Sequence, residues 1–286
     1  MKLTNKFNLP EPLVNAVKNQ AYSKGSSDIT VTQLIQPPLI RHLNALHHDK
    51  VEEDASSRIW ALLGSSVHSI LEKAYQGSNA RVEERVYAEV NGWKLGGQFD
   101  VLEGSTLSDY KITSVYAKDG KIEWENQLNV YAWLIEKVKK VPVTSVGIVA
   151  LIRDWKSREA ATKEGYPEAP IKELPIKLWS FEEREAYISS RIAKHSACDF
   201  ALETDGELPL CTPEEMWEKP TMYAVKKEGA VRAKSVHADK EEAEEALEKA
   251  GKGYILEVRE GERTRCANFC QVRDFCEQWK AYNNGN

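Results

Sequence analysis

Apolar and polar positions alternate along residues 82–112 in a way that predicts three neighbouring strands. The segment VYAEVNGWKLGGQFDVL predicts a β-hairpin turning at Asn91-Gly92, because this dipeptide adopts the backbone of a tight hairpin turn. TLSDYKI predicts the strand that follows. Residues 143–152, VTSVGIVALI, are nearly all apolar, which is typical of a strand buried on both faces. IKELPIKLW, residues 171–179, predicts one more strand.

Helical periodicity marks three longer segments. Apolar residues recur every three or four positions over residues 57–75, so we expect a helix there, capped by Ser56 or Ser57. Residues 125–139 repeat this pattern and predict a second helix. The third is expected from Ser180, a capping residue, to about Leu202, with acidic residues in the first turn, where the helix dipole favours them.

A second region begins near residue 206. Residues 221–237 predict a hairpin turning near Glu228-Gly229, residues 239–250 a helix stopped by Gly251, and residues 253–260 a strand. Together they form a small ββαβ module. We therefore expect two domains, residues 1–205 and 206–286.

Composition narrows the class of protein. The 286 residues are 42% apolar and carry a net charge of -5, so the chain is not a polycation that coats nucleic acid. A metal ion and a local basic groove could still handle phosphate. No apolar run is long enough to span a bilayer, and the start lacks the apolar core of a secretion signal. We expect a cytoplasmic protein with reduced thiols.

Two acidic residues, Asp100 and Asp109, lie near the ends of two predicted strands. Lys111 follows Asp109 by two positions, and residues i and i+2 of a strand share a face. Carboxylates hold hard divalent cations, and such a cation with a lysine beside it can hydrolyse a phosphodiester. Taken alone, this spacing is common by chance.

Other residues have two interpretations each. His68 follows a patch of small residues on the first predicted helix and is either a packing residue or a ligand. His47 and His48 are expected at the surface. Residues 153–170 predict a surface loop whose basic side chains either are solvated or touch a phosphate backbone; they are Arg153, Lys156, Arg158 and Lys163.

Order along the chain makes the pattern specific. A helical histidine, a hairpin ending in GGQFD, the DYK strand and a helix with Gln127 and Tyr131 follow one another between residues 64 and 152. This order resembles the PD-(D/E)XK nuclease superfamily, in its RecB-like exonuclease branch. The resemblance implies an α/β (α+β) fold: a restriction-endonuclease-like core with a central mixed sheet flanked by helices.

The resemblance also implies roles for individual residues. The metal, Mg²⁺ or Mn²⁺, would be held by His68, Asp100, Asp109 and the backbone carbonyl of Ile112. Lys111 would be the catalytic lysine, and Gln127 and Tyr131 would support the site and contact DNA. A further acidic ligand is expected at Glu83 or Glu84, with Glu84 favoured. The chain departs from the family pattern in having Gln98-Phe99 before Asp100 and Asp rather than Glu at position 109.

The cysteines suggest a second metal site. Cys266, Cys270 and Cys276 lie within eleven residues, a spacing at which thiolates converge on one ion or cluster. Cys211 is the better candidate for the fourth ligand and Cys198 the lesser. Zinc and iron remain alternatives on spacing alone. Some RecB-like nucleases, including the AddB and CRISPR-associated ones, hold a [4Fe–4S] cluster with one distant cysteine and a C-terminal trio, so the resemblance favours the cluster.

The leading hypothesis is a metal-dependent DNA exonuclease of recombination, repair or phage DNA processing, in a bacterial or phage-infected cell. An annealing protein or a helicase is an expected partner besides DNA. The alternatives are a structure-specific or defence-system endonuclease, and an inactive DNA-binding module.

Overall fold

The computed structural model describes residues 2–19, 24–117, 120–204 and 206–284. The chain folds into two compact units. The first comprises Met1–His42 and His48–Pro209, and the second Leu43–His47 and Leu210–Asn286.

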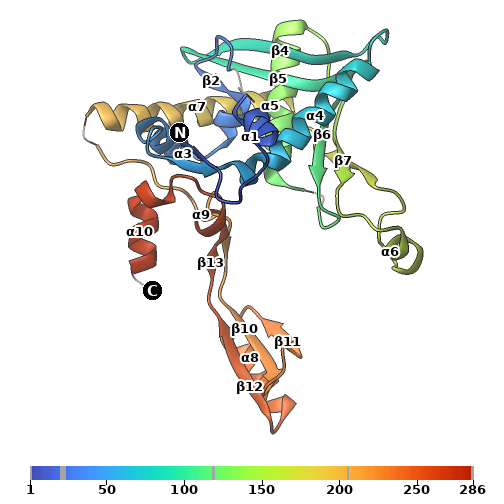
Figure 1. The fold of residues 1–286 in the computed structure, drawn as a ribbon. Helices are drawn as coiled ribbons and strands as arrows, with labels where there is room; N and C mark the ends of the chain where they lie inside the picture. Colours follow the sequence, from blue (N-terminus) through green and yellow to red (C-terminus); the bar gives the residue numbers. More distant parts are fainter. Residues whose placement is uncertain (1, 20–23, 118–119, 205, 285–286) are drawn as a thin grey trace. The chain divides into compact units, whose positions relative to one another are not determined.

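A mixed β-sheet forms the centre of the first unit, as expected for this fold class (Figure 1). The strands pair in the order β2-β5-β6-β7-β8, and β4 pairs with β5. The β4-β5, β5-β6 and β7-β8 pairs are antiparallel, whereas β2-β5 and β6-β7 are parallel. A separate parallel pair joins β1 to β3. The strands of this unit are β1 (Lys2–Thr4), β2 (Ile29–Thr30), β3 (Glu52–Asp54), β4 (Arg81–Val90), β5 (Trp93–Glu103), β6 (Thr106–Thr113), β7 (Ser145–Ile152) and β8 (Ile171–Ile176).

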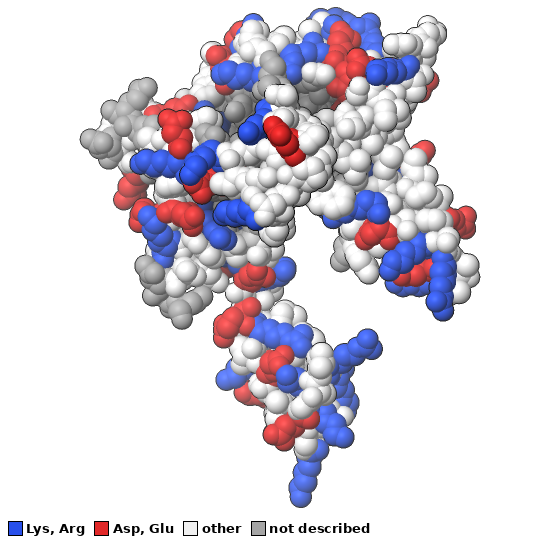
Figure 2. Space-filling view, viewed as in Figure 1, with Lys and Arg blue, Asp and Glu red and all other residues white. Residues whose placement is uncertain are grey.

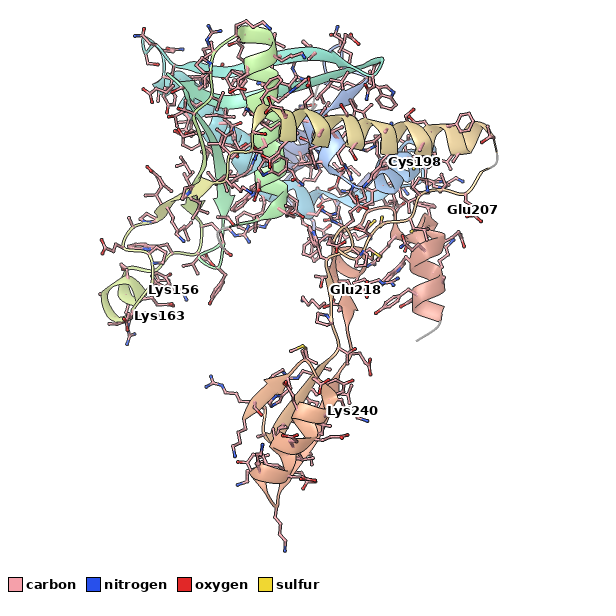
Figure 3. The ribbon with its side chains drawn as sticks, turned by 180° about the vertical axis from the view of Figure 1, so that it is seen from behind. Lys156, Lys163, Cys198, Glu207, Glu218 and Lys240 are labelled. Carbon is pink, nitrogen blue, oxygen red and sulfur yellow. The ribbon has the colours of Figure 1, made fainter. Side chains whose placement is uncertain are left out.

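Helices flank the sheet. Figures 1 and 3 show α5 and α7 on one side of the sheet and α4 on the other. The helices are α1 (Glu11–Lys18), α2 (Val31–Ile35), α3 (Pro38–Leu46), α4 (Ile59–Ala74), α5 (Ile122–Lys139), α6 (Ser157–Thr162) and α7 (Phe181–Glu203). Helix α5 is the most deeply buried of them and joins the sheet in one apolar core, with members such as Phe99, Leu107, Leu128, Leu134 and Ile148. Burying such side chains is the main force that holds the site's scaffold in place.

The hairpin predicted at Asn91-Gly92 is present. Asn91 has φ 49° and Gly92 φ 79°, so both central residues have the positive φ of a type I′ turn. This turn matches the right-handed twist of the flanking strands and fixes the register of β4 against β5, from Val90 opposite Trp93 to Arg81 opposite Leu102. That register decides which side chains of the two strands share a face.

Some boundaries differ from the sequence prediction. Neither Ser56 nor Ser57 caps helix α4, because a short 3-10 helix, Ala55–Arg58, precedes it and is capped by Asp54. Helix α5 begins three residues earlier than predicted, at Ile122. The segment expected to be a loop contains α6. The α7 prediction is confirmed, since Ser180 and Glu183 form a reciprocal capping box at its start.

The second unit contains the predicted ββαβ module. It consists of β10 (Met222–Lys227), β11 (Ser235–His237), α8 (Lys240–Ala250) and β12 (Tyr254–Arg259), with sheet order β11-β10-β12. Asp239 caps α8, whose Ala243 is fully buried. The remaining elements are β9 (Glu218–Lys219), β13 (Glu262–Arg263), α9 (Thr264–Asn268), the 3-10 helix η2 (Arg273–Phe275) and α10 (Glu277–Asn284). Across the described parts of both units, every helix is too short or too polar to cross a bilayer.

Candidate functional site

Three carboxylates meet because of the register of β4, β5 and β6. The β4-β5 pairing places Val82 opposite Val101 and Glu84 opposite Phe99, so Glu83 and Asp100 lie between these two pairs on their neighbouring strands. The β5-β6 pairing places Val101 opposite Ser108, so the next step brings Asp109 opposite Asp100. Residues opposite each other on antiparallel strands share a face. Neighbouring strands thus present a row of three acids, although each acid lies far from the others in sequence.

Helix α4 brings a histidine to this row. Nδ1 of His68 lies 3.0 Å from Oε1 of Glu83 and 3.5 Å from Oδ2 of Asp100. His68, Glu83 and Asp100 each offer one ligand atom within 4.8 Å of the other two. They are the one group of metal-ligating side chains this close together among the described residues. Two carboxylates and an imidazole suit a divalent cation such as Mn²⁺ or Mg²⁺.

Lys111 lies next to this row of acids and contacts one of them. Nζ of Lys111 lies 2.7 Å from Oδ2 of Asp109, whose side chain is 3% exposed. Burial lowers the pKa of Lys111, but the charge and hydrogen bond of Asp109, with the charge of Asp100, outweigh burial and raise that pKa above its usual value. The pair thus joins a buried carboxylate to a partly exposed lysine, and both residues line the site.

The carboxyl of Asp100 shows how crowded the negative charge is. Burial and the neighbouring Asp109 raise the pKa of Asp100 to about 7, against the opposing effects of His68 and Lys111. Oδ2 of Asp100 also accepts a hydrogen bond of 2.8 Å from the backbone N–H of Tyr110. The hydrogen bond to Glu83 raises the pKa of His68, despite its burial. Three carboxyl groups thus face Lys111 and His68, and a bound cation would balance their charge in place of the proton on His68.

Glu83 rather than Glu84 reaches the site, so the preference for Glu84 is wrong. Glu83 has φ 51°, a left-handed conformation that is rare outside glycine, and the strand pairing skips it. Glu84 points to the opposite face, as alternation along a strand requires, and pairs there with Lys139 and Arg81. These two partners lower the pKa of Glu84.

Two polar residues that the sequence did not single out for the site hold Glu83 in place. Gln98 donates to Oε2 of Glu83 at 2.7 Å, and Arg85 donates to Oε1 of Gln98 at 3.0 Å. The register pairs Arg85 with Gln98, so the chain of hydrogen bonds runs along one face of the hairpin. The hairpin prediction contained this signal, because counting back from the Asn91-Gly92 turn places Arg85 beside Gln98.

Helix α5 contributes Gln127 and Tyr131, one turn apart, to the walls of the same cleft. A Cβ at Gly97 would lie 2.5 Å from the ring of Tyr131 and 2.5 Å from Val31. Tyr131 therefore reaches its place because position 97 has no side chain. Gly97, the second glycine of GGQFD, thus serves the close approach of a helix to the strand that carries Asp100.

The site residues line an open cleft of about 680 Å³. Besides the acids, the lysine and the α5 residues, its walls include four small residues of α4: Ala61, Gly64, Ser65 and Ser69. The structure thus brings together His68, Asp100, Asp109, Lys111, Gln127 and Tyr131, as the sequence predicted. The role predicted for the Ile112 carbonyl stays a prediction.

The cysteines of the second unit gather as well. Cys211, Cys266 and Cys270 have pKa values raised first by burial and then by other groups, among them the neighbouring cysteines. Gln278 holds the backbone of Cys211 through two hydrogen bonds of 2.9 and 2.8 Å. Cys198, by contrast, lies on α7 of the first unit (Figure 3), and its pKa is raised by burial and by Asp199. Of the two candidates for the fourth ligand, the structure places Cys211 beside the trio.

Four thiols are a donor set that both a single zinc ion and an iron–sulfur cluster accept. Among the described cysteines, no three sulfur atoms come within 4.8 Å of one another.

In comparisons with known proteins, no protein-family model and no curated sequence matches this chain. Among solved structures, the chain is similar to "Crystal structure of SSO0001", at 20% sequence identity and a TM-score of 0.46. The match covers 64% of this chain and 85% of that one.

Proposed function

We propose that this chain is a divalent-metal-dependent DNA exonuclease. The observation that carries the proposal is the convergence of His68, Glu83, Asp100, Asp109 and Lys111 in one open cleft. Each of these groups has a task in hydrolysing a phosphodiester, and carboxylates with an imidazole are ligands that a divalent cation accepts.

His68, Glu83 and Asp100 are the residues that would hold the cation, with Asp109 beside them. A bound divalent ion would neutralise charge on the phosphate oxygens and provide a nucleophilic water at neutral pH. Gln98 and Arg85 orient Glu83, as outer hydrogen-bond partners orient the ligands of other metal sites.

Lys111 supplies positive charge to the reacting phosphate. Asp109 fixes its amine in the cleft, where the N–H groups can donate to a phosphate oxygen or orient the attacking water. Gln127 and Tyr131 line the same cleft and offer hydrogen-bond donors to the bound DNA strand. Positioning and fixed charge, rather than a covalent intermediate, would then account for catalysis.

The proposal is tested by incubating the protein with end-labelled linear DNA and with covalently closed circles, in Mn²⁺, Mg²⁺ or EDTA. We expect metal-dependent loss of the linear DNA, and circles that stay intact. Cutting of the circles would favour the endonuclease alternative. If neither substrate is cut with either metal while DNA still binds, the binding-module alternative replaces the proposal.

For the cysteines we propose a [4Fe–4S] cluster on Cys211, Cys266, Cys270 and Cys276. These residues bracket the ββαβ module within the second unit, so a cluster would tie the two ends of that unit together. Protein purified without oxygen should be brown and contain about four irons, and Cys270→Ser should lose both properties. Colourless protein with one zinc would contradict the cluster. An annealing protein or a helicase as partner stays a prediction.

A further inference from the structure

An aromatic ring stands exposed beside the candidate catalytic cleft. Trp60, in the first turn of α4, is 54% exposed, and the next residue, Ala61, lines the cleft. The guanidinium of Arg153 lies over the Trp60 ring, 4.4 Å from its centre. A large exposed indole is unusual on a soluble surface, and a cation over one face of it holds the ring in place. Figure 2 shows a mostly uncharged surface over α4.

Strand pairing places Arg153 at the same end of the sheet as the catalytic lysine. Strand β6 pairs in parallel with β7, with Lys111 opposite Ala150 and Thr113 opposite Ile152. Arg153 continues β7, and its N–H donates to the carbonyl of Thr113 at 2.9 Å. It therefore lies three residues beyond the level of Lys111, or about 10 Å along the strand. A stacked DNA strand spans that distance in roughly three nucleotides, at about 3.4 Å each.

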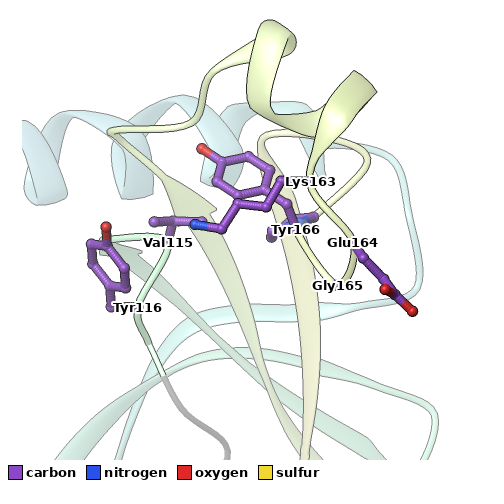
Figure 4. A pocket seen from close by; sticks show the side chains of 7 residues that line it. Val115, Tyr116, Lys163, Glu164, Gly165 and Tyr166 are labelled. Carbon is purple, nitrogen blue, oxygen red and sulfur yellow. The ribbon is translucent and has the colours of Figure 1, made fainter. Parts of the chain in front are cut away.

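A second group of aromatic residues lies farther from Lys111, past the ends of β6 and β7. The loops that follow β6 and β7 enclose a small pocket of about 150 Å³, lined by Val115, Tyr116 and residues 163–167. Figure 4 shows Tyr116 on one side of the pocket and Lys163 with Tyr166 on the other, while Glu164 points away. Tyr116 is 75% exposed. The pocket is thus partly open, with a tyrosine on each side.

Hydrogen bonds hold these loops in shape. The N–H of Val115 donates to Asp154 at 2.7 Å, which ties the β6 loop to the β7 loop. The indole N–H of Trp155 donates to the carbonyl of Pro167 at 2.8 Å, and the N–H of Lys156 to the hydroxyl of Tyr166 at 3.0 Å. The pocket is therefore formed before any ligand arrives, which lowers the entropic cost of binding.

We propose that these loops bind the unpaired bases of a single DNA strand that leads into the catalytic cleft. One base stacks on Trp60, and the pocket between Tyr116 and Tyr166 receives another. The inference rests on the proposed nuclease function and names its substrate as a strand with an unpaired segment. Bases inside a duplex are already stacked and show only their edges, so an exposed indole face selects for unpaired ones.

Charge alone does not explain this surface. Residues 153–170 carry equal numbers of basic and acidic side chains: Arg153, Lys156, Arg158 and Lys163 against Asp154, Glu159, Glu164 and Glu168. Figure 2 shows both signs of charge on the part that carries α6. Glu159 pairs with Lys156 and Lys163. Recognition by stacking, assisted by the cations that touch the rings, therefore fits better than a general attraction to phosphate.

The test measures binding of a labelled single-stranded dT oligonucleotide, by fluorescence anisotropy, to the full-length protein in EDTA, where cleavage is off. We expect Trp60→Ala to weaken binding on the order of tenfold to a hundredfold, the usual cost of losing one stacked base. Tyr116→Ala should weaken binding as well, and its exposed side chain can be removed without affecting folding. Trp60→Phe, which keeps a ring, should recover most of the loss.

Phe200→Ala is the matched control, because Phe200 is also an exposed aromatic residue, 64% exposed, on α7. It should bind like the wild type. An oligonucleotide that lacks the base at the position stacked on Trp60 should bind the wild type more weakly than the complete oligonucleotide does. Trp60→Ala should bind the two oligonucleotides equally well.

Suppose that the wild type cleaves DNA in the presence of metal, but that Trp60→Ala and Tyr116→Ala bind single strands as tightly as the wild type. The inference then fails while the proposed function stands, and the aromatic surface belongs to a protein partner. A wild type that neither binds nor cleaves DNA overturns both.

Discussion

Asp109 and Lys111 form an ion pair of 2.7 Å between alternate residues of strand β6. The pair is local, and any strand with this spacing could form it. What makes it part of a site is Asp100 on the neighbouring strand, brought opposite Asp109 by the register of β5 and β6. A sheet with a fixed register thus converts three separate sequence positions into one cluster of charges.

Glu83 and Glu84 provide a matched pair of substitutions on adjacent residues. Glu83→Gln removes a carboxylate that contacts His68, so Mn²⁺ affinity measured by calorimetry should fall at least about tenfold. Glu84→Gln removes the same charge from the opposite face, where Glu84 pairs with Lys139, and should leave Mn²⁺ affinity unchanged. Equal loss in both variants would show that net charge rather than the Glu83 position attracts the metal.

Gly97→Ala should destabilise the first unit and disturb the cleft. The new methyl group would lie 2.5 Å from the Tyr131 ring, and relieving such overpacking in a well-packed core costs about 1–3 kcal/mol. Urea unfolding followed by circular dichroism measures this cost. Gly64→Ala is the control for stability, because nothing lies within 4 Å of the added Cβ and alanine favours a helix by about 0.5–1 kcal/mol. A Gly97→Ala protein as stable as the wild type would contradict the packing described for Tyr131.

The contribution of His195 to the stability of the first unit should fall as the pH drops from 7 to 5, opposite in sign to the contributions of Asp100 and His68, whose pKa values are raised. Burial lowers the pKa of His195 to about 4, below that of an unfolded histidine. Its Nδ1 accepts a hydrogen bond from Arg41 at 3.0 Å, and Nε2 lies 3.1 Å from the Leu34 carbonyl, so the folded ring is neutral.

Between pH 6.5 and 4 the unfolded state therefore takes up a proton that the folded state does not. By pH 5 this should cost about 2 kcal/mol of unfolding free energy. Urea unfolding at pH 7 and pH 5 should show that the unfolding free energy of His195→Gln changes more favourably on going to pH 5 than that of the wild type, by about 2 kcal/mol, since Asp100 and His68 act alike in both proteins. Replacing the exposed His48 by Gln is the control. If His195→Gln keeps the full pH dependence, His195 is not its source.

The sequence predicted the parts of the fold that depend on local patterns. The Asn91-Gly92 turn, the Ser180 cap of α7 and the ββαβ module all rest on neighbouring residues, and all are present. Two-residue strands such as β2 left no pattern to read, because β2 exists only through its pairing with β5. The start of α4 was also missed, since Asp54 caps a 3-10 helix before it.

The site was predictable in its residue types and order, but not in every position. The choice between Glu83 and Glu84 depends on which of two adjacent residues faces His68, and the positive φ of Glu83 is not visible in the sequence. Arg41, by contrast, was unassigned, and the structure uses it to hold His195 and Asp199, 154 and 158 positions away. Such long-range contacts appear only once the chain has folded.

The most direct test of the account is the rate at which linear, end-labelled DNA is hydrolysed in Mn²⁺ by the wild type and by Lys111→Ala. We expect hydrolysis by the wild type that EDTA stops. Lys111→Ala should be slower by about 100- to 1,000-fold, the usual loss on removing one fixed charge or donor at a reacting centre. Its circular dichroism spectrum and its Mn²⁺ binding should stay close to those of the wild type. A folded Lys111→Ala protein that cuts DNA at the wild-type rate would contradict the account.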